Sequence, residues 1–289
     1  MLIHHLQPLT DVFDFVHHVF ERPVTQRRIG LIILWIYLIA LAGIELNRNG
    51  LLPPRLAAIT PLGHFNAIHL AFTLILALEV MGLILTISRS VGRSVGKQLE
   101  ILALILLRNA FKELGALPEP VSVAGNLDPI LNIIVSGVGA LCIFGCLCVF
   151  NRIFRSQGFI QAPEIRMRYV MTKKLLALFL FVIFCCLAAR DLFLFVARGS
   201  GQDFFETIYT VLIFADIALV LIAQRYMPTF HAVFRNSGFV IGTLLMRLSL
   251  SALPPLDTAI SVVAALYILA LTWVTNHFMS PQREGGAKP

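Results

Sequence analysis

Apolar residues along this chain fall into repeated runs of about 20, separated by short polar turns. A helix of that length is what a chain needs to cross the roughly 30 Å hydrocarbon layer of a bilayer. The pattern therefore predicts an all-α, polytopic membrane protein whose transmembrane helices form antiparallel hairpins. The eight predicted spans cover residues 29–47, 65–87, 97–115, 129–151, 173–197, 205–224, 237–253 and 257–278.

The composition agrees with this pattern. Hydrophobic residues make up 58% of the chain and charged residues 13%, whereas a soluble domain carries about 25% charged residues. We therefore expect one transmembrane bundle over residues 29–278, preceded by a cytoplasmic segment (1–28) and followed by a short cytoplasmic tail (279–289). The start of the chain lacks the basic stretch of a cleavable signal peptide.

Positive charge lies mainly on one side of the predicted bundle. Lysine and arginine mark the cytoplasmic side of a membrane protein, so we expect both termini in the cytoplasm and the bundle in the plasma (inner) membrane. The basic loops, above all 152–174, are expected to bind anionic lipid headgroups, and no nucleic acid is expected as a partner. The segments 1–28, 89–97, 152–174, 225–236 and 279–289 hold 16 lysines and arginines, against 3 in the loops of the other side.

The segment before the first span has the pattern of an amphipathic helix. Asp11 is a suitable N-cap, and Pro23 ends the pattern. We expect this helix to lie in the cytoplasmic membrane interface, and packing of the same apolar face under the bundle is the open alternative. The apolar face carries Val12, Phe13, Val16, Val19 and Phe20.

Three pairs of consecutive spans resemble one another, which predicts a weak internal repeat of the kind found in transporters. The pairs begin with the spans at 65–87, 129–151 and 205–224. In each pair a basic turn joins the two helices, and the second helix carries an arginine seven to nine residues before its outer end. These arginines are Arg108, Arg190 and Arg247, and we expect all three to point inward.

Two acidic residues lie at a matching depth. Glu79 is ten residues before Arg89, and Asp216 is nine before Arg225, so both are about 14 Å from the cytoplasmic surface. Because an unpaired charge at that depth is costly, we expect the pairs Glu79–Arg108 and Asp216–Arg247.

The middle arginine has no acid at the matching place. Arg190 has Asp191 beside it instead, and its pairing with Asp216 or Glu79 across the bundle stays open.

This charged network favours one leading function and two alternatives. A transporter or channel-like permease would use the residues as an ion or solute path, since arginine suits phosphate and carboxylate groups and the acids suit protons or cations. A structural or accessory subunit, with a membrane protein partner or as a homo-oligomer, would use them as dry helix clips. An intramembrane enzyme is the third class.

No cofactor is predicted, although two kinds were considered. The thiols of Cys142, Cys146 and Cys185 could form a Cu(I) site, but buried cysteine usually behaves as a small apolar residue. Haem would need histidines at matched depth on facing helices, and His69 and His277 do not match in depth.

Overall fold

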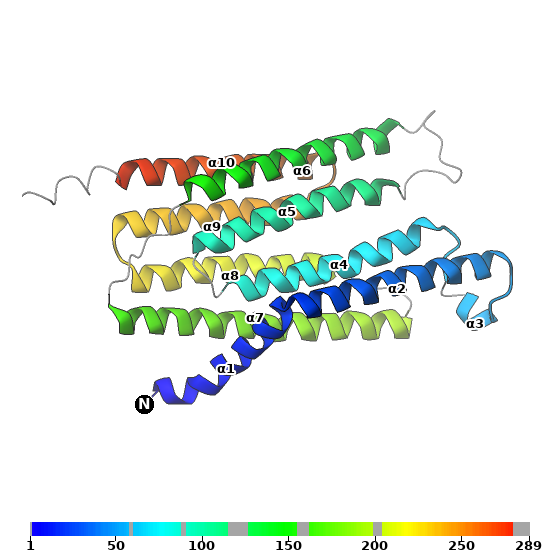
Figure 1. The fold of residues 1–289 in the computed structure, drawn as a ribbon, viewed down its shortest axis with the longest axis horizontal. Coiled ribbons are helices and arrows are strands. Elements are labelled where there is room, and N and C mark those ends of the chain that lie inside the picture. Colours follow the sequence, from blue (N-terminus) through cyan, green and yellow to red (C-terminus); the bar gives the residue numbers. More distant parts are fainter. Residues whose placement is uncertain are drawn as a thin grey trace, which may run out of the picture.

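A computed structural model describes residues 2–57, 60–87, 91–114, 127–154, 162–198 and 204–279. The all-α prediction is confirmed, since the described residues form helices joined by turns and contain no strand. The eight predicted spans correspond to α2 and α4 to α10 (Figure 1). The helices are α1 (Leu2–Glu21), α2 (Pro23–Arg48), α3 (Pro54–Ala57), α4 (Phe65–Thr86), α5 (Val91–Glu113), α6 (Leu127–Ile153), α7 (Pro163–Arg198), α8 (Phe204–Tyr226), α9 (Phe230–Leu250) and α10 (Leu256–Met279).

The protein is a helical membrane bundle. Within the described ranges, α2, α4, α6, α7, α8 and α10 are long and apolar enough to cross a bilayer. The remaining predicted spans, α5 and α9, are 23 and 21 residues long but more polar. Both are central helices, since α5 packs between α4 and α6 and α9 packs between α8 and α10. A helix flanked on two sides by protein can carry polar groups that a lipid-facing helix cannot.

The bundle consists of two rows of four helices. Consecutive helices pack side by side in the order α2, α4, α5, α6 in the first row and α7, α8, α9, α10 in the second. Contacts of α6 with α10, α5 with α9 and α4 with α7 join the rows. Helices that hold the same position in their rows, such as α5 and α9, run in the same direction and lie at similar levels of the stack (Figure 1).

Two of the three predicted hairpins pack as pairs, and the middle one does not. The hairpins α4–α5 and α8–α9 pack as expected, and they occupy matching places in the two rows. By contrast, α6 and α7 are not packed neighbours, because the connection between them leads from the end of one row to the start of the other. The middle predicted hairpin is therefore not a packed pair, and the connection between α6 and α7 is the crossover from one row to the other.

Two apolar cores lie at opposite ends of this stack. One joins α5, α6, α9 and α10 around Leu106, Ile143 and Ile268. The other joins α1, α4, α7 and α8 around Phe13 and Leu212. The layer between the cores, where α4 meets α5 and α8 meets α9, is where the buried ion pairs lie. We call it the polar layer.

Each row uses two glycines, four residues apart, to bring its third helix close to its fourth. In α9, a Cβ at Gly238 or Gly242 would overlap Leu271 or Ile268 of α10. In α5, Gly92 and Gly96 face the rings of Phe154 and Phe150 in the same way. Small residues at this spacing permit close helix contact in membranes.

The N-terminal helix is longer than predicted. It begins at Leu2, so Asp11 is not an N-cap but an exposed residue inside α1. Aspartate favours caps, yet it also occurs on exposed helix faces, and the helical backbone continues on both sides of it. Phe13 is buried against the bundle while Val12 and Phe15 are exposed. Phe13 therefore packs against the bundle, as the alternative predicted. Pro23 is the first residue of α2, so the amphipathic pattern ends before it, as predicted.

Candidate functional site

The second row holds the more deeply buried ion pair. Arg247 Nε on α9 donates to Asp216 Oδ2 on α8 at 2.7 Å, and the two side chains are 3% and 2% exposed. The short connection after α8 makes α8 and α9 antiparallel neighbours, so residues at equal depth face each other. The structure thus pairs Asp216 with Arg247, which the sequence had suggested only from their similar depth.

The first row holds the matching pair in a looser form. Arg108 Nη1 lies 3.4 Å from Glu79 Oε2 and also donates to the carbonyl oxygen of Phe72 at 3.3 Å. The Arg108 and Glu79 side chains are 10% and 16% exposed. This pair links α4 to α5 as the other links α8 to α9, so both cross the polar layer.

The third arginine is not part of this layer. Arg190 is exposed on α7, and Asp191 beside it is half-buried. The expectation that Arg190 points inward is wrong, because α7 begins its row and corresponds in rank to α2, not to the arginine-bearing α5 and α9.

A small cavity of about 20 Å³ lies between the rows, next to the second ion pair. Its walls come from α5 of the first row and from α7, α8 and α9 of the second. A space of this size holds about one water-sized molecule. Its polar lining among the described residues is Ser94, Gln98, Lys173, Asp216, Asn236 and Thr243.

Asp216 is the polar lining residue that the sequence predicted as a site residue, and the buried cation Lys173 is one of those that it did not. It was counted among the cytoplasmic loop residues, but its side chain is 2% exposed and its Nζ lies 5.1 Å from the centre of the Tyr169 ring. Neighbouring residues on a helix point about 100° apart. Lys174 accordingly reaches the surface and pairs with Asp14 at 2.6 Å, while Lys173 turns inward.

Arg235 was also counted among the loop residues, and it too is buried. Its guanidinium carbon lies 5.5 Å from the ring centre of Phe154 and 5.6 Å from that of Phe239. Two of the basic residues that predicted orientation are therefore part of the interior.

Two buried donors near the cavity have no hydrogen-bond partner among the described residues. They are Asn236 Nδ2, on a side chain that lines the cavity, and Arg247 Nη2. A buried donor left unpaired costs about 1–3 kcal/mol. Such groups in native proteins usually meet ordered water or a ligand.

A sequence signal for part of this site does exist. Gln98 precedes Arg108 by ten residues, and Asn236 precedes Arg247 by eleven. Eleven residues are about three helical turns and ten are somewhat fewer, and on each central helix both the amide and the arginine are buried. In the linear sequence, Gln98 and Asn236 are two polar residues among many. Their similar spacing from an arginine becomes informative only because α5 and α9 occupy matching places in the two rows.

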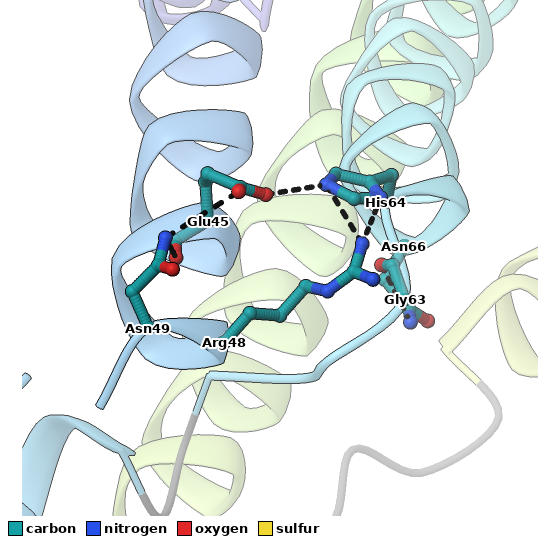
Figure 2. A network of polar contacts seen from close by, with 6 residues as sticks. All are labelled: Glu45, Arg48, Asn49, Gly63, His64 and Asn66. Carbon is teal, nitrogen blue, oxygen red and sulfur yellow. Dashed lines mark hydrogen bonds and ion pairs between the residues drawn. The ribbon is translucent and has the colours of Figure 1, made fainter. Parts of the chain in front are cut away.

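A second polar cluster lies at the other end of the bundle and ties α2 to the start of α4 (Figure 2). Glu45 Oε2 is 3.0 Å from His64 Nε2, and Arg48 Nη1 is 3.1 Å from His64 Nδ1. Asn49 Nδ2 donates to the Glu45 carbonyl oxygen at 2.9 Å. These side chains are largely exposed, so the cluster is a helix-end clip outside the polar layer.

The thiols are not gathered in one place. Cys142 and Cys146 lie on α6 and Cys185 lies on α7, two helices that do not pack together. Across the described ranges, no group of three or more His, Cys, Asp or Glu side chains could hold a metal ion. This placement gives the Cu(I) hypothesis no geometric support.

The chain matches no protein-family model, no curated protein and no solved structure. The polar layer is therefore the main indication of its function.

Proposed function

We propose that this protein is a transporter or channel-like permease for a small ion, with the polar layer as its path. The observation that carries this proposal is the polar cavity between two repeated four-helix rows. In transporters built from repeats, the ion or substrate site lies near the bilayer midplane where the repeats meet. The cavity lies where the two rows meet, toward the helix ends that carry the basic turns.

The polar residues of the layer also favour an ion path over a purely structural role for the ion pairs. A clip needs only the two ion pairs, whereas Lys173 and Asn236 add a buried cation and a buried amide. Each polar group in a membrane interior is costly and usually marks function. The excess of polar groups beyond the pairs therefore favours transport.

The cavity is narrow in this structure, so transport requires the rows to move. The two larger apolar cores lie on opposite sides of the polar layer, so opening the layer would separate the small cluster of Leu83, Ile101 and Ile105 but leave both larger cores intact. The charge distribution further supports a bundle in the plasma (inner) membrane with the basic turns and both termini in the cytoplasm.

Cysteine accessibility tests this proposal. In a cysteine-free background, Lys173→Cys, Asp216→Cys and Asn236→Cys would be probed from each side with a small charged thiol reagent. A water-filled path predicts labelling of all three from one face. The control is Lys174→Cys, which is one residue from the cavity but at the surface and should label in either case. Glu79→Cys, Arg108→Cys and Arg247→Cys extend the test along the layer.

The accessory-subunit alternative rests on one observation, the near-complete burial of Asp216 and Arg247. If Lys174→Cys labels while none of the polar-layer cysteines does in a correctly folded protein, the layer is dry. The protein would then be a subunit that meets a membrane partner or a second copy, and transport would be abandoned.

A further inference from the structure

We propose that the groove between α1 and the start of α7 binds a phospholipid with a primary ammonium headgroup, phosphatidylethanolamine. The ammonium group would pair with Asp11 on α1, and the phosphate with Arg166 on α7. This lipid site goes beyond the ion path and does not depend on it, because the groove shares no described lining residue with the cavity of the polar layer.

The groove is large enough for a headgroup. The N-terminal part of α1 leads away from α7 (Figure 1), and an open space of about 520 Å³ lies between the two helices. Clefts that bind small molecules commonly measure about 300–1,000 Å³. A lipid headgroup seated there would contact both helices at once.

The groove carries charges of both signs. Asp14 and Lys174 already pair with each other at 2.6 Å. By contrast, the Asp11 carboxylate and the Arg166 guanidinium line the groove without a hydrogen bond or ion pair to any described residue. A ligand with one positive and one negative group satisfies both side chains, whereas an anionic lipid brings its charge close to Asp11 with nothing to offset it.

The groove lies at the level where the helices of the bundle end. The hydroxyl oxygens of Thr172 and Tyr226 are 3.3 Å apart, and the rings of Tyr169 and Tyr226 contact each other. The first turns of α7 are therefore level with the end of α8, where the chain turns into α9. In a bilayer, the ends of spanning helices lie among the lipid headgroups.

One wall of the groove is apolar. It consists of Met167, Val170 and Met171 on α7. Methionine side chains adapt to the shape of what they contact, and the glycerol and first methylenes of a lipid would cover this wall. A small soluble zwitterion would leave the wall in water, so the wall favours a lipid.

The lining also distinguishes between the two common zwitterionic headgroups. A primary ammonium group has three N–H donors for a carboxylate such as Asp11. The quaternary ammonium group of phosphatidylcholine has none and is usually bound by aromatic rings. No aromatic side chain is among the described residues that line the groove, which favours ethanolamine over choline.

The binding test uses the purified full-length protein in detergent. Its thermal unfolding would be followed while dioleoyl-phosphatidylethanolamine is added to the micelles. A ligand that binds the folded state stabilises it, so we expect a saturable rise in melting temperature. Dioleoyl-phosphatidylcholine and dioleoyl-phosphatidylglycerol at the same mole fraction should give smaller rises. Free phosphoethanolamine should give none.

Variants then assign the effect to the groove. Asp11→Asn and Arg166→Gln should each weaken binding of phosphatidylethanolamine by about three- to tenfold, because one charge-assisted contact is lost. The matched controls are Glu164→Gln and Arg168→Gln, which remove the same charges from α7 at positions outside the described lining and should leave binding unchanged. All four side chains are exposed, so none of these changes disturbs the core.

The identity of the headgroup gives a second readout. Asp11→Asn should abolish the preference for phosphatidylethanolamine over phosphatidylglycerol, since only the former has a group that pairs with the carboxylate. A change that merely loosened α1 would weaken binding of both lipids alike and leave the preference in place.

The proposal is overturned if the wild-type protein responds alike to phosphatidylethanolamine and phosphatidylglycerol, or if the response survives both Asp11→Asn and Arg166→Gln. Equal stabilisation by free phosphoethanolamine would make the groove a site for a soluble zwitterion and would reject the lipid. None of these measurements involves ion flux, so their outcome is independent of the test of transport.

Discussion

The two rows of the bundle carry the same acid–arginine link in different surroundings. In the first row the Glu79–Arg108 contact is 3.4 Å long and partly exposed. In the second row the Asp216–Arg247 contact is 2.7 Å long, almost fully buried and next to a polar cavity. From the sequence alone the two pairs are indistinguishable, because each has an acid and an arginine at matching depths.

The difference shows how neighbours decide what a charged pair does. A looser pair gains less attraction, so breaking it costs less. A pair closed within the protein is costly to break, since the remaining charge has no alternative partner. We infer that the first-row pair only holds α4 to α5, whereas the second-row pair holds α8 to α9 and also borders a polar cavity.

Removing the acid of the buried pair should have the largest effect. Asp216→Ala leaves Arg247 buried without the carboxylate that it contacts, and we expect the free energy of unfolding to fall by about 3–5 kcal/mol. Titration of the purified protein with a denaturing detergent would measure this. The double variant Asp216→Leu with Arg247→Met should recover most of the loss, because both charges leave together. A double variant as unstable as the single one would contradict this account.

The second largest effect is expected from a larger residue at the close contact between α9 and α10. Gly242→Leu forces α9 away from Ile268 of α10, and we expect a loss of about 1–3 kcal/mol. The same titration measures it. Gly137→Leu on α6 is the control, since a Cβ there meets no atom within 4 Å. Equal losses at the two glycines would mean that helix propensity or lipid contact, and not packing, explains the result.

Neutralising the acid of the first row should cost less than removing Asp216. Glu79→Gln keeps the shape of the side chain and a hydrogen-bond acceptor for Arg108, so we expect about 1–2 kcal/mol. Unfolding measured beside Asp216→Asn, the equivalent change in the second row, makes the comparison direct. If Glu79→Gln costs as much as Asp216→Asn, the two rows are equivalent and the difference in burial has no energetic meaning.

The smallest effect is expected at the surface pair that joins α1 to α7. Asp14→Asn removes the partner of Lys174, and an exposed pair of this kind contributes about 0–1 kcal/mol. Phe13, which is buried in the core, should hold α1 in place without it. Limited proteolysis at the α1–α2 junction would report detachment of α1, and rapid cleavage in Asp14→Asn would show that the ion pair matters more than the apolar contact.

The sequence by itself determined the helices, their apolar spans and the depth of the charged residues. These properties depend on local quantities, namely the length of an apolar run and the 1.5 Å rise of each helical residue. Residue spacing therefore predicted that Glu79 with Arg108, and Asp216 with Arg247, lie at nearly the same depth.

The tertiary structure alone decided which helices are neighbours, and with them the meaning of each polar residue. Lys173 and Lys174 are equivalent in the sequence, but only Lys173 faces the gap between α7, α8 and α9. Arg190 matches Arg108 and Arg247 in spacing, yet it is exposed because α7 starts a row and does not lie at its centre. A helix has the same local pattern wherever it packs, so the direction of a side chain relative to the bundle is set by contacts between segments far apart in the chain.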